Sequence, residues 1–392
     1  MSFHENSGLA AHFADDLSRV DAAEWNALVR SDDSPFLEWE WLELLERSGS
    51  VGGDTGWAPR HLLVRRNGRL AAAAPLYLKL HSEGEFVFDY IWADAARQLG
   101  LPYYPKLVGM SPFTPAAGYR FLVAEDEDWR MLTRTMLDMM EAYAKEQGAQ
   151  GAAFNFVDAQ WGEWAERHGY RRWMHQSFIW DNAGYGSFDD FLARFRSQTR
   201  KSIRRERRDL AAAGVEVKPV VGAQITPELM ELMYQLYVKT NSKFGIWGCE
   251  YLSESFFAQM LDRFRDNLVL MAAWREGDDT APVGMSLLVR KGGELWGRYW
   301  GCRREVPFLH FETCLYGPVI WAIEQGIRRF YPGIGGEHKM RRGFVSVAES
   351  SLHKLFHPAL EALLKTYLPA VNNLEQDQIQ AMNRQLPFRQ RG

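Results

Sequence analysis

The sequence predicts an α+β fold made of two domains, each with a mixed, mostly antiparallel sheet and flanking helices. Three observations lead to this prediction. The chain has 392 residues, which suggests two or three domains. Its hydrophobic fraction of 46% is large enough to build a core in each of them. The third observation is that one order of elements, a β-hairpin, a strand, a helix, a glycine and a strand, occurs twice along the chain.

In the first copy, Asn67-Gly68 separates two apolar runs, which is a strong signal for a hairpin turn. Gly148 follows a helical pattern, as a C-terminal cap would. The elements expected are the strands His61–Arg66, Leu70–Leu80 and Glu85–Trp92, the helix Thr133–Glu146 and the short buried strand Ala152–Val157.

The second copy repeats the order, with Lys291-Gly292-Gly293 as a turn and Gly326 ending the helix. The elements expected are the strands Leu268–Trp274, Pro282–Arg290 and Glu294–Trp300, the helix Glu312–Glu324 and the strand Ile327–Tyr331. Asn, Gly and Ser at 182–187 interrupt the pattern. We therefore expect domains at 10–181 and 188–370, with a packing helix at 359–367 and a polar, frayed tail at 371–392.

Composition narrows the class of protein. The formal net charge is −4, so the chain is no polycation built to coat nucleic acid, and no DNA partner is expected. Three cysteines without a CxxC pair favour a reducing compartment, and the start of the chain lacks the pattern of a signal peptide. No apolar window is long enough for a transmembrane segment, so a cytoplasmic protein is expected. No spacing predicts a metal site.

The most distinctive segment is RFRSQTRKSIRRERRDL, at 194–210, in which Glu206 and Asp209 are the acidic residues. It is expected to form a helix that ends before Gly214. Cations this dense repel one another, and a phosphate-bearing partner would relieve the repulsion. The alternative is a solvated basic helix without a ligand.

Several blocks resemble one known family. Arg200-Lys201-Ser202-Ile203-Arg204 is similar to the basic segment of Fem-type aminoacyltransferases. SPFLEWEWL at 34–42 looks like the opening helix of the same family. Further blocks resemble a bacterial branch described as Fem-like predicted N-acyltransferases; these are YYPK at 103–106, SPFTP at 111–115, GRYWGC at 297–302, VPFLHFETC at 306–314 and GEHK at 336–339. The resemblance covers about residues 34 to 356. It implies tandem domains of the GNAT type, a role linked to peptidoglycan precursors, and ligand binding by Arg200, Lys201 and Arg204.

The sequence departs from the GNAT pattern at one point. Acetyl-CoA enzymes of that superfamily carry a glycine-rich loop whose backbone amides hold the pyrophosphate at a helix N-terminus. The corresponding stretch here, Cys302–Thr313, contains no glycine. No tightly bound cofactor is expected. The co-substrate would be an acyl donor, either an acyl-CoA held differently or an aminoacyl-tRNA.

Candidate catalytic residues follow the strand Glu294–Trp300. His310 could take a proton from an attacking amine without any special pKa shift, and Glu312 could orient it. On a strand the two side chains would share a face, whereas at a helix start they would diverge. A helix-capping Glu and a packed His are the alternative. The polar block also contains Tyr299, an expected substrate contact.

Three further residues complete the candidate site. In the family that the chain resembles, a lysine after the last strand lies at the active site, and Lys339 matches it; its charge could neutralise an oxyanion. Asp89 is expected inside an apolar strand, where it is either paired structurally or faces ligand. Lys106 is a candidate for acceptor contacts in a proline-punctuated loop.

The function expected is transfer of an acyl or aminoacyl group from an activated donor to an amine by direct attack. The partner would be a phosphate-bearing small molecule or a tRNA donor. Two alternatives remain open at this point. The first is an acetyl-CoA-dependent GNAT acetyltransferase of a small amine, and the second is a non-catalytic module that binds tRNA or a nucleotide-linked ligand.

Overall fold

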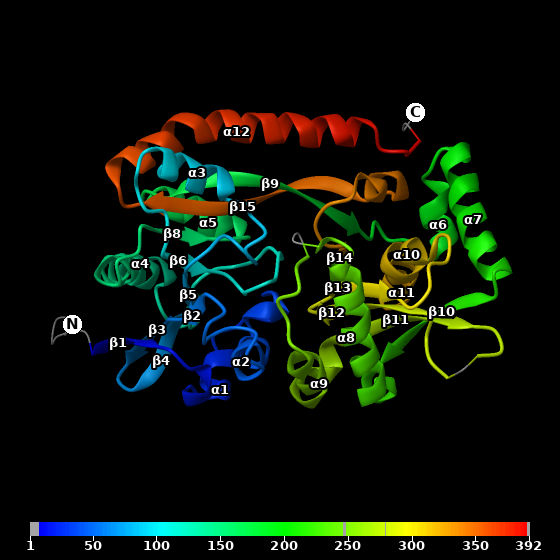
Figure 1. Ribbon diagram of the computed structural model, residues 1–392, viewed down its shortest axis with the longest axis horizontal. Coiled ribbons are helices and arrows are strands. Elements are labelled where there is room, and N and C mark those ends of the chain that lie inside the picture. Colours follow the sequence, from blue (N-terminus) through cyan, green and yellow to red (C-terminus); the bar gives the residue numbers. More distant parts are fainter. Residues whose placement is uncertain (1–7, 246–247, 279, 390–392) are drawn as a thin grey trace. The chain divides into compact units, whose positions relative to one another are not determined.

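The computed structural model describes residues 8–245, 248–278 and 280–389, which form two compact units (Figure 1). Unit 1 runs up to His175 and includes Glu349–Gln376, and unit 2 holds Gln176–Ala348 and the residues from Asp377 onward. The chain passes between the units within β9 (Arg171–Asp181), β15 (Val345–Leu355) and α12 (Pro358–Arg384). Residues 349–370, expected in the second domain, therefore belong to the first unit.

Unit 1 contains two sheets. The first has the strand order β1-β3-β4-β7, and the second runs from β15 through β8, β6 and β5 to β2. Pro75 lies between β4 and β5, where a proline cannot donate a ladder hydrogen bond, and it divides the single strand expected at 70–80. The strands are β1 (Leu9–Ala14), β2 (Trp57–Pro59), β3 (His61–Arg66), β4 (Arg69–Ala74), β5 (Leu76–Lys79), β6 (Lys106–Gly109), β7 (Leu122–Val123) and β8 (Gly151–Phe154).

The predicted hairpin at Asn67-Gly68 is confirmed, since both residues have positive φ, +51° and +87°, as a type I′ turn requires. The strand predicted at Glu85–Trp92 is wrong. Phe86 and Phe88 have φ of +60° and +53°, which no strand adopts, and a helix begins at Tyr90. The helices of unit 1 are α1 (Ala22–Asn26), α2 (Trp39–Arg47), α3 (Tyr90–Gln98), α4 (Trp129–Glu146) and α5 (Ala159–Glu166).

Unit 2 is built on one sheet with the order β10-β11-β12-β13-β14-β9. Its core gathers Trp180, Phe195, Leu295, Phe330 and Phe344, all at most 1% exposed. The elements are α6 (Phe188–Ala193), α7 (Ser197–Ala212), β10 (Val215–Val221), α8 (Pro227–Ser242), α9 (Glu254–Arg263), β11 (Leu268–Arg275), β12 (Gly284–Lys291), β13 (Glu294–Cys302), α10 (Leu309–Phe311), a π-helical turn (Glu312–Tyr316), α11 (Gly317–Glu324), β14 (Arg329–Tyr331) and a 3-10 helix (Glu337–Arg342).

The two units share one connectivity, although in unit 1 the strand before the crossover helix is β6 and not the strand expected at 85–92. In unit 1, β5 pairs antiparallel with β6, and β6 pairs parallel with β8 after the crossover through α4. In unit 2, β12 pairs antiparallel with β13, and β13 pairs parallel with β14 after α11. Gly148 and Gly326 end the two crossover helices, both with positive φ. This confirms the α+β class with mixed sheets.

The predicted frayed tail is wrong over the part that the structure describes. The helix α12 continues to Arg384, because its polar side chains find backbone partners. Asn372 Oδ1 accepts a hydrogen bond from the backbone N–H of Met174 at 2.8 Å, and Asn383 Oδ1 accepts one from Ser346 at 2.9 Å. Beyond the helix, the ring of Phe388 packs against Phe195 with centroids 5.0 Å apart.

Candidate active site

A cavity of about 670 Å³ lies in unit 2 where the parallel strands β13 and β14 part. The two strands pair over only three positions, Glu294–Trp296 with Arg329–Tyr331. Beyond this point β13 continues to Cys302, while the chain after Tyr331 leaves the sheet. Gly297–Trp300 of β13 line one side of the cavity, and Pro332–Gly336, which follow β14, line the other. The remaining wall residues include His310, Cys314, His338 and Lys339. A gap between parting parallel strands is a usual place for a ligand in such sheets.

A β-bulge shapes the first wall. The register of β13 against β12 passes from Gly297, opposite Leu288, to Tyr299, opposite Leu287, and skips Arg298. A bulge takes one residue out of the ladder and redirects the neighbouring side chains. Tyr299 lines the cavity, and its ring packs against Tyr237 with centroids 5.2 Å apart. The predicted substrate contact at Tyr299 therefore lies in the cavity wall.

His310 also lines the cavity. Phe308, with φ of +67°, turns the chain into α10, and the imidazole of His310 then packs edge-on against Trp300 at a centroid distance of 4.7 Å. Burial lowers the pKa of His310 to about 4, and the nearby His338, Lys339 and Arg342 act in the same direction. The expectation of an unshifted histidine is thus corrected, because the ring is neutral throughout the physiological pH range.

Glu312 faces away from His310. The chain at this point is helical, so two side chains two positions apart diverge. The Glu312 carboxylate is 8% exposed and accepts two hydrogen bonds from Arg207 Nε of 3.0 Å each. Burial raises the pKa of Glu312, and Arg207 opposes this shift. The contacts of Glu312 do not support its expected role in orienting His310. Through Arg207, Glu312 instead anchors α7 to the turn that carries His310.

Lys339 lies at the opposite wall, on the 3-10 helix Glu337–Arg342. It is 5% exposed, and its Nζ donates hydrogen bonds to the carbonyls of Gly333 at 2.7 Å and Ile334 at 3.2 Å. Burial lowers the pKa of Lys339 to about 8. The structure therefore brings two of the three predicted catalytic residues, His310 and Lys339, to one cavity.

Two further side chains of the wall were not predicted as site residues. The Nε2 atom of His338 is buried and has no hydrogen-bond partner among the residues that the structure describes, and its ring lies 5.5 Å from that of His310. Burial raises the pKa of the Cys314 thiol to about 12, so Cys314 is protonated and a poor nucleophile. Within the part of the chain that the structure describes, no group of three or more metal-ligating side chains is placed to hold a metal ion.

The basic segment forms α7, as expected. Two of its arginines have partners within the protein, and four of its cations, one of these arginines included, are exposed to solvent. Arg200 Nη1 donates to the carbonyl of Phe195 at 3.3 Å, and Arg204 pairs with Asp189 at 2.8 Å. Lys201, Arg204, Arg205 and Arg208 are exposed, at a spacing that places them along one helix face. We call these four residues the cationic stripe. Glu206 accepts hydrogen bonds from Tyr316 at 2.6 Å and Arg342 at 2.9 Å, and so ties α7 to residues beside the cavity.

The predicted ligand contacts Asp89 and Lys106 are buried ion-pair partners in unit 1, 0% and 1% exposed. Lys106 lies on β6 rather than in a loop, and Asp89 precedes α3 rather than lying in a strand. Tyr103 and Tyr104 each donate a 3.1 Å hydrogen bond to Asp89. Burial opposes the charge on each partner, but the ion pair keeps the pKa of Asp89 below and that of Lys106 above its ordinary value. Neither side chain is open to a ligand.

In unit 1 the corresponding gap beyond the parallel strands β6 and β8 is filled. The backbone N–H groups of Gly118 and Tyr119 donate to the carbonyl of Phe156, each at 2.9 Å, and Asp158 N–H donates to the carbonyl of Tyr119 at 2.8 Å. The Tyr119 ring is 3% exposed and stacks on Phe154. The cavity of unit 2 therefore has no open counterpart at this position in unit 1.

No helix in the described part of the chain has the length and apolar character needed to cross a bilayer. The sequence matches the model of the FemAB-like family, described as peptidoglycan biosynthesis/recognition, over residues 16–390. No curated protein matches it.

Solved structures share the fold at low sequence identity. FemX has a TM-score of 0.55 and 14% identity, over 89% of this chain and 99% of that one. The C-terminal domain of a putative lysylphosphatidylglycerol synthetase from Agrobacterium fabrum has a TM-score of 0.51 and 13% identity, over 88% and 95%. A conserved protein of unknown function from Bacteroides thetaiotaomicron has a TM-score of 0.51 and 12% identity, over 88% and 99%. With a family match over nearly the whole sequence and a fold shared with FemX, the resemblance found in the sequence is confirmed: the chain belongs to the FemAB-like family.

Proposed function

We propose that this protein is an acyltransferase that moves an acyl or aminoacyl group from an activated ester or thioester to an amine, by direct attack in the cavity of unit 2. The observation that carries the proposal is that His310 and Lys339, 29 positions apart in the sequence, line one cavity where β13 and β14 part. Membership of the FemAB-like family and the fold shared with FemX support a transferase.

The reaction needs three things from the protein: alignment, oxyanion stabilisation and proton transfer. The amine lone pair forms the new C–N bond, and the carbonyl becomes an oxyanion. The Lys339 ammonium, fixed by two backbone carbonyls, stabilises that charge. The neutral His310 accepts the proton that the amine loses and passes it to the leaving oxygen or sulfur as the old bond breaks. The low pKa of His310 favours this second transfer.

The cationic stripe of α7 supports a phosphate-bearing donor. Lys201, Arg205 and Arg208 are exposed, and no hydrogen bond or ion pair is found for them among the described residues. Because the stretch 302–313 has no glycine-rich loop for a pyrophosphate, we favour an aminoacyl-tRNA over acetyl-CoA as donor. Cys302 and Cys314 form no disulfide among the described residues, and the three cysteines include no CxxC pair, in keeping with a cytoplasmic protein, where charged tRNA is available.

The test is a transfer assay with two donors, a mixture of charged tRNAs and acetyl-CoA, and with uncharged tRNA as the control that has no group to transfer, each given to the protein with a pool of amines. Multiple turnovers with a charged donor, lost in Lys339→Met and kept in the control Lys365→Met, would support the proposal. Lys365 is exposed on α12, in the part of that helix that belongs to unit 1, and it does not line the cavity of unit 2. Stoichiometric binding of tRNA without any turnover would instead show a binding module, and turnover with acetyl-CoA alone would show a GNAT acetyltransferase.

A further inference from the structure

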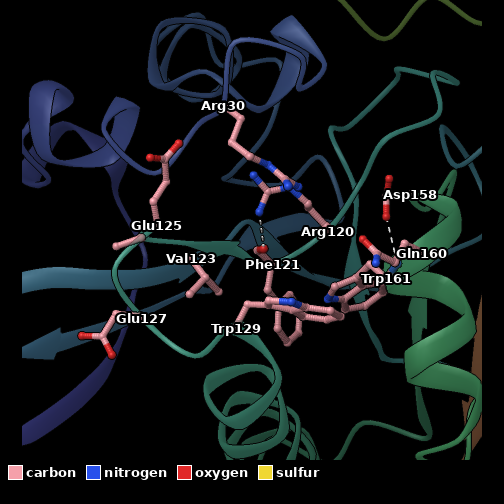
Figure 2. A pocket seen from close by; sticks show the side chains of 11 residues that line it. Arg30, Arg120, Phe121, Val123, Glu125, Glu127, Trp129, Asp158, Gln160 and Trp161 are labelled. Atoms are coloured by element: carbon pink, nitrogen blue, oxygen red, sulfur yellow. Dashed lines mark hydrogen bonds between the residues drawn. The ribbon is translucent and has the colours of Figure 1, made fainter.

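Unit 1 has a cavity of its own, of about 330 Å³, that the proposed reaction does not use. Its walls come from segments that are far apart in the sequence: Arg30, the stretch 120–129, and the start of α5 at Asp158–Trp161. Figure 2 shows Arg30 and Arg120 at one edge, Glu125 and Glu127 at another, and Asp158 and Gln160 near a third, with the indoles of Trp129 and Trp161 between them. The volume is at the small end of the range for ligand pockets.

The charged groups around this cavity balance one another. Arg120 is held by Asp33, with Nε 2.8 Å from Oδ1, and Arg30 Nε lies 3.7 Å from the same carboxylate. Glu127 pairs with Arg66 at 2.7 Å. Arg69 Nη2 also lies 3.8 Å from Glu127, so with Glu125 and Asp158 four carboxylates stand against four guanidinium groups. A charged ligand would meet nearly as many like charges as opposite ones, so this cavity selects a neutral ligand.

The same groups still have hydrogen-bonding capacity. Asp158 uses one oxygen to cap α5, accepting from the Trp161 backbone N–H at 2.8 Å, and Gln160 is exposed. Trp161 is 3% exposed, and its Nε1–H, a donor only, is buried and finds no acceptor within the described part of the chain. The rings of Phe121, Trp129 and Trp161 supply apolar faces. The ligand must therefore combine flat C–H surfaces with several groups that both donate and accept.

We propose that this cavity is a binding site for a neutral saccharide ring. The C–H face of a pyranose packs on aromatic rings, and its hydroxyls match carboxylate acceptors and guanidinium, amide and indole donors. The site belongs to unit 1 alone, so it stands independently of the reaction proposed for unit 2.

The experiment uses the full-length protein and measures binding of methyl glucoside and N-acetylglucosamine by calorimetry and ligand-observed NMR. Methylammonium and acetate, a cation and an anion, serve as charged comparisons of smaller size. The variants are Trp129→Ala, which removes an aromatic face, and Gln160→Ala, an exposed position that leaves the fold unaffected. The matched control is Arg134→Ala, which lies on α4 outside the cavity and pairs only with Asp138 at the surface.

We expect at least one neutral sugar to bind saturably. Trp129→Ala should weaken this binding about tenfold, which is in the range for one lost aromatic contact. Gln160→Ala should also weaken it. Arg134→Ala and Lys339→Met should bind as the wild type does, which separates this site from the proposed active site. The inference is overturned if no neutral sugar binds saturably, if methylammonium or acetate binds more tightly than the sugars, or if Gln160→Ala and Trp129→Ala leave sugar binding unchanged.

Discussion

Replacing Lys339 by methionine should separate activity from stability. The substitution keeps the length of the side chain but removes an ammonium that is 5% exposed. Turnover should fall by about 10²–10³, the usual cost of losing one group that stabilises an oxyanion. The free energy of unfolding should not fall in parallel, because burying the charged Lys339 ammonium destabilises the folded protein at pH 7.

The cost follows from the pKa. Burial lowers the pKa of Lys339 from 10.5 to about 8, and at 1.36 kcal/mol per unit the buried charge costs about 3 kcal/mol at pH 7. Between pH 8 and 10.5 the unfolded lysine binds more protons than the folded one, so the stability of the wild type rises with pH in this window. The methionine variant lacks this contribution. Its stability relative to the wild type should therefore drop by about 2–3 kcal/mol from pH 7 to pH 10.

The measurement is urea unfolding of the wild type and the variant at pH 7 and pH 10. At each pH, the free energy of unfolding of the variant is subtracted from that of the wild type, and only this difference is compared. Other groups titrate equally in both and cancel. Lys365→Met, an exposed position, should show a difference that does not change with pH. If the difference for Lys339→Met is equally constant, or if this variant is several kcal/mol less stable at pH 7, the assignment of Lys339 as a costly buried cation is wrong.

Four other outcomes are expected. When kcat/KM is expressed per concentration of neutral amine, since only the unprotonated acceptor attacks, its pH profile should be flat from about pH 5 to 7.5, because His310 must be neutral and has a pKa near 4, and should fall above about 8 as Lys339 loses its proton; an inflection near 6.5 would contradict this. His310→Ala should lower turnover about 10²–10⁴-fold with little change in Tm, as followed by calorimetry. Arg207→Ala should cost about 1–2 kcal/mol in urea unfolding, because Glu312 loses its partner, and adding Glu312→Gln should restore part of it. Changing Lys201, Arg205 and Arg208 to Ser should lower the slope of log affinity for tRNA against log salt by about three, and an unchanged slope would exclude the stripe as the binding surface.

The features that the sequence predicts well are those set by local chemistry. Asn67-Gly68 needs two residues that tolerate positive φ, and it makes the same turn in any fold. Gly148 and Gly326 end their helices for the same reason. Alternating and continuous apolar runs predict β11, β12, β13 and β14 within about two residues of their observed ends, whereas β9 and β10 were not predicted.

The errors arise where distant residues decide the structure. The segment 85–88 is apolar enough for a strand, but Glu85 pairs with Lys79 at 3.0 Å, and the backbone bends through positive φ at Phe86 and Phe88. Glu312 was assigned to His310 from spacing alone, whereas its partner Arg207 lies 105 positions away. The cavity of unit 1 joins Arg30 to Trp161, and no local pattern reveals such a juxtaposition. His338 could have been found, since it belongs to the same GEHK block as Lys339.

The most direct test of the central claim is a structure of the protein with a donor analogue in which the aminoacyl group is joined to the 3′ end of a tRNA acceptor fragment by a stable amide. The account predicts that the acyl carbonyl lies in the cavity of unit 2, with its oxygen within hydrogen-bond distance of Lys339 Nζ and its carbon beside His310. An analogue bound with its acyl group outside this cavity, or with Lys339 still turned only toward Gly333 and Ile334, would contradict it.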